Sequence, residues 1–424
     1  MRISSLLRSK PSESVFKQQP PDRYVANLQS LIGGNSVRLL HDGREVFPEI
    51  RALFSNATTH IHIEMYFWNS DPFGWEMADL LAAAAQRGVI VRLLVDAAGC
   101  VDTQIDIFDS LEKRGVHVKM FHPLAPWRPR WSWNNRTHRK IIMADGKIAI
   151  IGGLNISGEY AAVKDDVNLW RDCAFRIEGP AVGSINQAFS HSWASHTEND
   201  TGGRRFLNTS PPGIRNGSDG KVRSLPSPDT VSSCADGVEQ PAADVVVIPT
   251  GTPWPKNGIE RAVVFAIKHA KTSVYIACAY FIPGAQLRRA LRKAARRGVD
   301  VRLLLPSEST DIKTVYYASR HLYARLLRSN IRIYEWCGDM LHAKMVIVDS
   351  TYVLVGSANL DPRSRYHNYE LSVATINTKI GLAAHQRFMD DLTKSKEVKR
   401  ESWLKRGFGK QLLERIAFLF RYWL

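Results

Sequence analysis

Two copies of one pattern of polar residues, 204 positions apart, limit what this chain can fold into more than any other feature. Each copy has a histidine, a lysine two residues later, an aspartate and an asparagine, with apolar residues between the lysine and the aspartate. On a strand, residues two apart point to the same face, so each histidine projects together with its lysine. Because every spacing is repeated, the two copies predict two related structural units. The two sets are His138, Lys140, Asp145 and Asn155, and His342, Lys344, Asp349 and Asn359.

The repeat extends well beyond these residues. Residues 87–94 and 297–304 are identical at seven of eight positions. In each half, strand-like and helix-like segments alternate in the same order, which indicates βαβ units and a mainly parallel sheet flanked by helices. We therefore predict an α/β fold of two tandem halves related by pseudo-two-fold symmetry, with one shared site at their junction. The predicted strands are 60–67, 89–95 and 116–120 in the first half, and 273–281, 299–305 and 331–334 in the second.

Composition divides the chain into five parts. Residues 1–24 form a basic lead that is predicted to be disordered, and residues 196–243, rich in Gly, Ser, Pro, Asn and Asp, form a predicted flexible linker. The two halves occupy residues 25–195 and 244–392. Residues 393–424 form a predicted amphipathic basic helix at the C-terminal end.

The net charge of +16 over 424 residues predicts attraction to a polyanion, either nucleic acid or an anionic membrane surface. Composition alone does not choose between them. No run of about 18 apolar residues is present, so we expect no helix that spans a bilayer. Five scattered cysteines lack metal-ligand spacing and no signal peptide is present, which together predict reduced thiols in the cytoplasm.

The C-terminal segment alternates apolar and basic residues at helical spacing. Apolar and aromatic residues recur every three or four positions from Leu404 to Trp423, and basic residues from Lys405 to Arg421 lie between them. A basic amphipathic helix that ends in aromatic residues is typical of a membrane interface. A terminal helix docked on the core is the alternative, and the pattern favours the membrane.

The paired motif suits chemistry at a phosphodiester, whose anionic oxygens repel nucleophiles. One imidazole can attack phosphorus and become phosphorylated, while the other protonates the leaving alcohol and later activates the acceptor. The two lysines would neutralise the charge that builds on the phosphoryl oxygens, and Asn155, Asn359 and Ser357 would donate hydrogen bonds to them. Such a site needs neither a metal nor another cofactor.

The order His-x-Lys, four residues, Asp, and then a Gly-containing turn and Asn resembles the motif of the phospholipase D superfamily, whose members pair two such motifs at one active site. The resemblance implies that His138 is the nucleophile and that His342 is the general acid and base. It also implies a mainly structural role for Asp145 and Asp349. In that family an acidic residue further along the chain from each histidine orients the ring. The acidic residues at these positions are Asp172 and Glu370.

A narrower resemblance, carried by residues 64–66, 152–155 and 356–364, is to bacterial cardiolipin synthases, in a short form without N-terminal transmembrane helices. It implies transfer of a phosphatidyl group from phosphatidylglycerol or phosphatidylethanolamine to phosphatidylglycerol through a phosphohistidine intermediate. It also implies a peripheral enzyme on the cytoplasmic side of the inner membrane, with anionic phospholipid as its partner.

Two alternatives use the same chemistry. A phospholipase D would hydrolyse the phospholipid, and would differ only in that water resolves the phosphohistidine. A nuclease of the superfamily would suit the positive charge. The duplicated chain resembles the lipid enzymes more closely, so we expect no nucleic acid partner.

Overall fold

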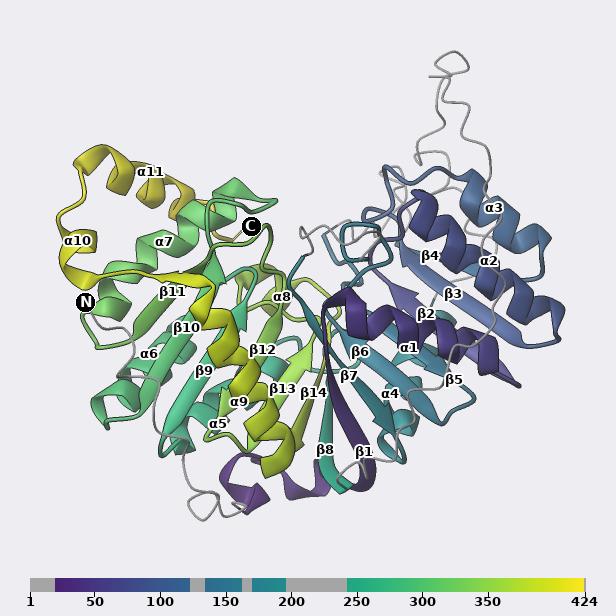
Figure 1. The fold of residues 1–424 in the computed structure, drawn as a ribbon, viewed down its shortest axis with the longest axis horizontal. Helices are drawn as coiled ribbons and strands as arrows, with labels where there is room; N and C mark the ends of the chain where they lie inside the picture. Colours follow the sequence, from purple (N-terminus) through teal and green to yellow (C-terminus); the bar gives the residue numbers. More distant parts are fainter. Residues whose placement is uncertain (1–19, 123–133, 162–169, 196–241, 423–424) are drawn as a thin grey trace.

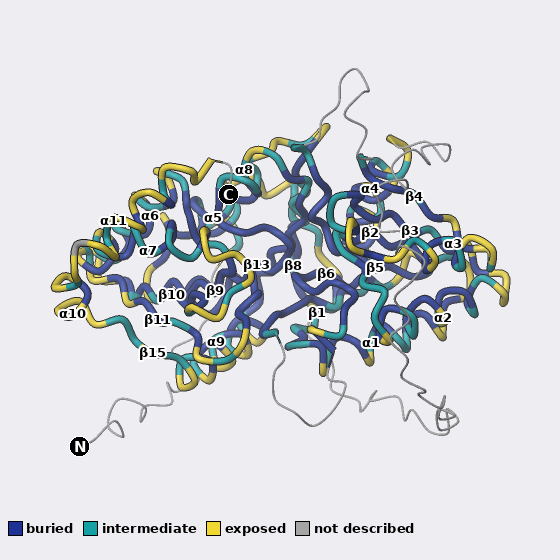
Figure 2. The backbone as a smooth tube through the Cα atoms, turned by 90° about the horizontal axis from the view of Figure 1, so that it is seen from above, coloured by how far each residue is buried: buried dark blue, intermediate teal, exposed yellow. Residues whose placement is uncertain are grey.

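The computed structural model in Figure 1 describes residues 20–122, 134–161, 170–195 and 242–422. Nearly all of the predicted linker and most of the predicted lead lie outside the described residues. One continuous sheet of 15 strands runs through the molecule, with helices on both of its faces. Figure 2 shows that the strands form the buried interior and that the exposed residues lie mostly on the helices and loops around them.

The strands of both halves alternate with helices in the sequence. The first half contains β1 (Ile32–His41), β2 (His60–Met65), β3 (Ile90–Asp96), β4 (His117–Phe121), β5 (Ile141–Ala144), β6 (Ile148–Gly152) and β7 (Cys173–Glu178). The second half contains β8 (Ala242–Pro249), β9 (Ser273–Cys278), β10 (Asp300–Pro306), β11 (Arg332–Trp336), β12 (Lys344–Val348), β13 (Tyr352–Gly356), β14 (Leu371–Ile376) and β15 (Ser395–Glu397).

The strand order is symmetric about the centre of the sheet. There β1 pairs with β8 in antiparallel register, with Ser36 beside Ala242. Outward from this pair, the order β7, β6, β5, β2, β3, β4 in the first half mirrors β14, β13, β12, β9, β10, β11 in the second. This order confirms the predicted α/β fold of two related halves. The halves share one sheet, which the sequence did not predict.

The strand directions correct the prediction of a mainly parallel sheet. Among the described strands, parallel pairing is confined to β2–β3–β4 and β9–β10–β11, and every other pair in the sheet is antiparallel. The reason lies in the connections: β5 and β6 are joined by the short turn 145–147, and β12 and β13 by 349–351. A connection this short can join only antiparallel neighbours. The two motifs therefore lie on the antiparallel part of the sheet.

Most of the helices pack on three large clusters of buried side chains. Helices α1, α2 and α3 cover a cluster in the first half, and α5, α6 and α7 cover its counterpart in the second. Helices α4 and α9 cover a third cluster, to which strands of both halves contribute. This shared core fixes the two halves against each other. The helices are α1 (Asp42–Asn56), α2 (Pro72–Gln86), α3 (Asp106–Lys113), α4 (Ala181–Ala194), α5 (Gly258–His269), α6 (Ala285–Arg296), α7 (Lys313–Leu327), α8 (Pro362–Tyr366), α9 (Thr378–Thr393), α10 (Arg400–Leu404) and α11 (Phe408–Leu419).

Both ends of the described chain differ from the sequence prediction. Residues 20–24, assigned to the disordered lead, pack on the second half, where Tyr24 is 1% exposed and donates a hydrogen bond of 3.0 Å from its hydroxyl to Asp349 Oδ2. The C-terminal segment is not one helix: it contains the edge strand β15 and the separate helices α10 and α11. In the described part of the chain, no helix combines the length and the apolar character needed to cross a bilayer.

Candidate active site

A cavity of about 480 Å³ brings the two motifs together, because both motif histidines and both motif asparagines line it. His138 precedes β5 and His342 precedes β12, which are equivalent strands in the symmetric sheet. The structure therefore places His138, His342, Asn155 and Asn359 around one space, although their positions in the chain are far apart.

Backbone hydrogen bonds between the halves hold each histidine in place. The His138 amide donates to the Tyr369 carbonyl at 2.9 Å, and the His342 amide donates to the Arg171 carbonyl at 2.8 Å. Tyr369 and Arg171 each directly precede an acidic residue that contacts a motif histidine. The position of each imidazole therefore depends on docking of the other half.

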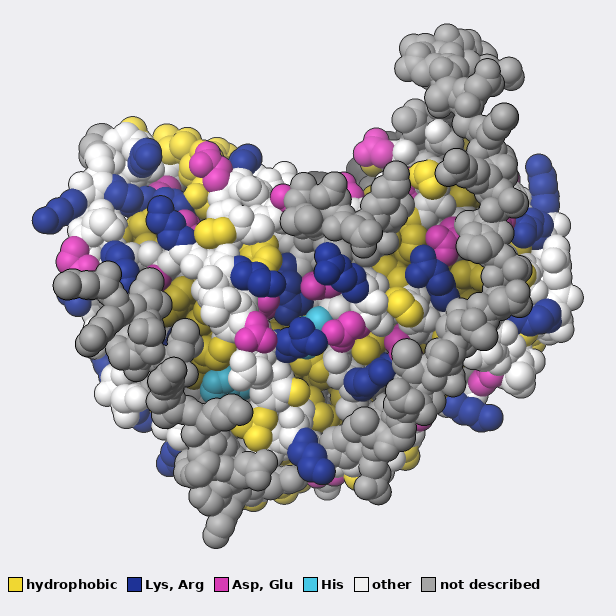
Figure 3. Space-filling view, in the orientation of Figure 1, with side chains coloured by type: hydrophobic (Ala, Val, Ile, Leu, Met, Phe, Trp, Pro, Cys, Tyr) yellow, Lys and Arg dark blue, Asp and Glu magenta, His cyan; other side chains and the backbone are white. Residues whose placement is uncertain are grey.

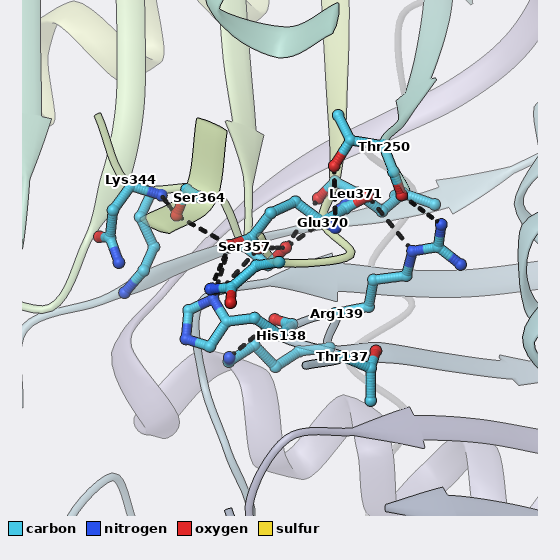
Figure 4. Close-up of polar contacts among 12 residues, drawn as sticks. Thr137, His138, Arg139, Thr250, Lys344, Ser357, Ser364, Glu370 and Leu371 are labelled. Atoms are coloured by element: carbon cyan, nitrogen blue, oxygen red, sulfur yellow. Dashed lines mark hydrogen bonds and ion pairs between the residues drawn. The ribbon is translucent and has the colours of Figure 1, made fainter. Parts of the chain in front are cut away.

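His138 pairs with Glu370 of the second half (Figure 4). Its Nδ1 lies 3.1 Å from both carboxylate oxygens. The carboxylate also accepts hydrogen bonds from Ser357 Oγ at 2.5 Å, Ser364 Oγ at 2.8 Å and Asn368 Nδ2 at 3.2 Å. Burial alone would raise the pKa of Glu370, but His138, the charge of Lys140 and the hydrogen bond from Ser357 lower the pKa below its ordinary value. Glu370 is thus held as a carboxylate.

His342 pairs in turn with Asp172 of the first half, with 2.7 Å between Nδ1 and Oδ2. Asp172 Oδ1 accepts a hydrogen bond of 2.7 Å from the Cys173 amide. Gly153 lies directly against this carboxylate, and a Cβ at Gly153 would come within 3.0 Å of it. The sequence analysis associated each carboxylate with the histidine that precedes it in the same half. The structure corrects this, because each carboxylate contacts the histidine of the opposite half.

The two motif lysines lie beside their own histidines. Lys140 Nζ donates to the His138 carbonyl at 2.9 Å, and Lys344 Nζ lies 2.9 Å from the imidazole nitrogens of His342. Burial and the positive charge of Lys344 lower the pKa of Lys140, and burial also lowers the pKa of Lys344. Both amino groups are buried and Lys344 acts on the pKa of Lys140, so an anion bound in the cavity would favour the charged form of both lysines.

The motif aspartates lie away from the cavity, at the opposite ends of the strands. Asp145 accepts hydrogen bonds from the Thr58, Thr59 and His60 amides, where β2 begins. Asp349 does the same for residues 271–273 at the start of β9. These contacts suit the structural role that the sequence resemblance implies. Neither aspartate lines the cavity, although both belong to the motif that carries the catalytic candidates.

The protonation of the site is set by burial. Burial and Lys140 lower the pKa of His138 to about 4, against the opposing effect of Glu370. Burial and Lys344 lower the pKa of His342 well below its ordinary value. Burial raises the pKa of Asp172 to about 6. Without a bound anion, both imidazoles are therefore neutral near pH 7.

The predicted phosphate-binding residues divide into two groups. Asn155 and Asn359 face the cavity, and among the described residues the buried Oδ1 atom of each has no hydrogen-bond partner. Asn155 Nδ2 donates to the Tyr160 hydroxyl at 3.1 Å. Ser357 does not line the cavity: its hydroxyl donates to Glu370, and it is fully buried. The geometry thus corrects the prediction for Ser357, which supports the carboxylate rather than a phosphate.

The chain is similar to known lipid-synthesising proteins along most of its length. The family described as "Cardiolipin synthase, PLD-like domain" matches residues 50–193 and 263–392, which include both motifs. The chain is 34% identical over 378 residues to cardiolipin synthase 2 of Bacillus cereus, covering 89% of this chain and 68% of that protein. It is 31% identical over 379 residues to cardiolipin synthase of Halalkalibacterium halodurans, covering 89% of this chain and 70% of that protein. The chain belongs to the cardiolipin synthase family.

A solved structure supports the fold of this cardiolipin synthase family member. The phosphatidylserine synthase of Haemophilus influenzae superimposes with a TM-score of 0.68 and 15% sequence identity, covering 96% of this chain and all of that one. At this identity the likeness bears on the fold alone. Together with the family match, it agrees with two phospholipase D-like halves, and the family assignment makes the chain a phosphatidyltransferase enzyme.

Several residues of this cardiolipin synthase site were missed by the sequence analysis. The Tyr160 hydroxyl lies 3.3 Å from His342 Nδ1, and the rings of Tyr66 and Trp170 lie beside the two histidines. Ser364 and Asn368 support Glu370. The repeat held usable signals, because Tyr160 and Ser364 occupy the same position relative to the asparagine of their motif. Trp170 and Asn368 likewise share a position, two residues before the acidic residue of their half, and Tyr66 lies in a segment that carries the family resemblance.

Proposed function

We propose that this enzyme makes cardiolipin by transferring a phosphatidyl group from phosphatidylglycerol or phosphatidylethanolamine to a second phosphatidylglycerol, through a covalent phosphohistidine. One observation carries the proposal: two imidazoles, each held through Nδ1 by a carboxylate of the opposite half, line one cavity. A two-step displacement at phosphorus needs one nucleophile and one proton carrier on either side of the phosphate.

In the first step His138 attacks the phosphorus of the donor. The bond from Nδ1 to Glu370 leaves the Nε2 lone pair available, and the lowered pKa keeps the ring unprotonated. The P–N bond forms as the bond to the headgroup oxygen breaks, and His342 gives its proton to that oxygen. The negative charge of the bound phosphate raises the pKa of His342, so that substrate binding itself supplies the proton carrier. Glycerol or ethanolamine leaves.

In the second step the now neutral His342 removes a proton from the glycerol hydroxyl of the acceptor. The resulting oxygen attacks phosphorus, the P–N bond breaks, and His138 is restored. In both steps the anionic phosphoryl oxygens lie near Lys140 and Lys344, with the amides of Asn155 and Asn359 as hydrogen-bond donors. Preorganised cations and amides of this kind act on the charge that develops in the transition state.

The substrates also fix where the enzyme works. Both lipids lie in a bilayer, so we propose a peripheral enzyme at the cytoplasmic face of the inner membrane. The partner is anionic phospholipid, and the charge of +16 favours such a surface.

The test uses vesicles of phosphatidylglycerol, labelled in the phosphate, with and without phosphatidylethanolamine. Wild-type protein is expected to form cardiolipin and, after rapid denaturation, to carry label on the chain. His138→Ala should abolish both signals and His342→Ala should abolish cardiolipin, whereas His117→Ala, at an exposed histidine of β4, serves as a matched control. Phosphatidic acid as the only product would instead indicate a hydrolase. Cleavage of DNA without any lipid product would contradict the proposal.

A further inference from the structure

One side of helix α11 packs against the rest of the protein. Ala417 and Glu414 are buried at 4% exposure each, and Ala417 joins a small apolar cluster with Ile282 and Val315. The ring of Phe418 stacks on His321 of α7, with 4.5 Å between centroids. This side alone accounts for the docking of α11 on the fold.

The opposite side of α11 is apolar and exposed. Its residues recur at spacings of three and four, so they form one stripe along the helix. More than half of the large apolar side chains that are exposed in the described chain lie between residues 404 and 422. Figure 3 shows hydrophobic side chains along the upper edge of the lobe to which α11 belongs. A patch of this kind on a soluble surface is typical of an interaction site. The stripe consists of Leu412 (43% exposed), Leu413 (46%), Ile416 (46%), Leu419 (73%) and Phe420 (56%).

Helix α11 lies beside the catalytic cavity. Just beyond α11, the Tyr422 ring lies 5.3 Å from His367, which immediately follows α8. Val315, which packs with Ala417 of α11, lines the cavity itself. Anything bound to the outer side of α11 would therefore lie near the cavity in which we propose that the reaction occurs.

The same region carries positive charge that the protein does not neutralise. A pocket of about 230 Å³ between α7 and α11 is lined by guanidinium groups, and Glu414 pairs with two of them, Arg320 and Arg406. Within the described residues, Arg325, Arg328 and Arg415 of this pocket have no ion pair with a carboxylate.

Neighbouring helices extend this positive region. Burial and the charges of Arg325, Arg292 and Arg421 lower the pKa of Arg288 on α6, as expected where positive charges gather. The region therefore presents an apolar stripe flanked by unpaired cations.

We propose that α11 and the arginines of this pocket form the surface by which the enzyme docks on an anionic phospholipid bilayer. The apolar stripe enters the boundary between headgroups and acyl chains, and the arginines contact lipid phosphates. A second copy of the chain suits the surface poorly, because it would bring its own unpaired arginines against these. The inference rests on the proposed function in one respect: it explains how lipid headgroups reach the cavity without leaving the membrane.

Vesicle binding tests the inference directly. Full-length protein is sedimented with vesicles of equal parts phosphatidylglycerol and phosphatidylcholine, and with vesicles of phosphatidylcholine alone. Wild type should bind the anionic vesicles more tightly. Ile416→Ser combined with Leu419→Ser should weaken binding at least about tenfold, because the apolar groups that enter the lipid are lost. Arg415→Gln should weaken binding about fivefold, and only to anionic vesicles.

Matched controls and a second readout keep the result interpretable. Ile90→Ser replaces an equally exposed isoleucine (49%) on β3 of the other half, and Lys147→Gln removes an exposed cation there. Neither should change binding. The ratio of turnover on vesicles to turnover on monomeric short-chain lipid should fall in the α11 variant and stay constant in the controls.

The outcomes separate this inference from the proposed function. Binding through α11 by a protein that forms no cardiolipin would support the docking surface and contradict the synthase. Unchanged vesicle binding by the α11 variant would overturn the docking surface, whatever the protein catalyses. So would a wild-type dimer in sedimentation velocity that the α11 variant dissociates, since the occupant would then be a second copy.

Discussion

Replacement of Glu370 by glutamine removes one charge from the centre of the site and keeps its shape. Both oxygens of Glu370 lie 3.1 Å from His138 Nδ1, so the new amide nitrogen faces this nitrogen in one of its two orientations. An N–H directed at Nδ1 requires a lone pair there, which moves the imidazole proton to Nε2. The atom that must attack phosphorus then carries a hydrogen. The serine hydroxyls that now donate to the carboxylate can rotate and accept from the amide instead.

The expected loss is about 10⁴-fold in kcat, or about 5 kcal/mol of transition-state stabilisation, as for other histidines deprived of an orienting carboxylate in otherwise intact geometry. The pKa of His138 should also fall further below its present value of about 4, because Glu370 raises it. The protein should remain folded, since the amide fills the same volume and retains hydrogen-bond partners.

The assay is initial-rate cardiolipin formation over a range of pH, beside thermal unfolding of each variant. Glu397→Gln is the matched control, because Glu397 forms surface ion pairs with Arg332 and Lys399 far from the cavity. If Glu370→Gln retained more than about a tenth of the wild-type kcat while unfolding at the same temperature, the orienting role of the carboxylate would be refuted.

Two further predictions concern the other half of the site and the stability of the fold. Gly153→Ala places a Cβ within 3.0 Å of the Asp172 carboxylate and so displaces it from His342; we expect at least about a 100-fold loss of kcat in the same assay, and near-normal activity would contradict the contact. Burial and Arg171 lower the pKa of His41 in the folded protein to about 3, so on acidification the unfolded chain protonates this histidine before the folded protein does. The stability that neutral His41 provides above pH 6.5 is therefore lost as the pH falls from 6.5 toward 3. Urea unfolding should therefore show about 2 to 3 kcal/mol of loss from this group between about pH 7 and pH 4.5, a loss that His41→Gln lacks.

The repeat in the sequence was sufficient for the symmetric architecture. A duplicated order of strands and helices requires two similar units, and the matching positions of β5 and β12 follow from the spacing of the motifs. The direction of the strands was predicted wrongly, because alternation with helices describes only β2–β4 and β9–β11. The short turns that begin at each motif aspartate, 145–147 and 349–351, decide the antiparallel part of the sheet, and alternation with helices does not describe them.

The terminal segment shows the limit of periodicity. Helical spacing identified an apolar stripe but gave two possible uses for it, a membrane or the core. In the structure α11 is apolar on both sides: Ala417 and Phe418 pack on the fold, while Ile416 and Leu419 face outward. Periodicity measures the direction of apolar side chains about one helix axis, and it carries no information on which neighbour lies on each side.

The sequence by itself identified the side chains that we propose carry the chemistry, because the types and spacings of His138, His342 and their lysines are local properties of the chain. Only the tertiary structure decided how they are paired. Glu370 contacts a histidine 232 positions away, and Asp172 contacts one 170 positions away, each across the junction between the halves. Such partners are selected by the pairing of β1 with β8, which joins the halves in one sheet, and by a core that both halves share, and these are contacts that no local pattern encodes.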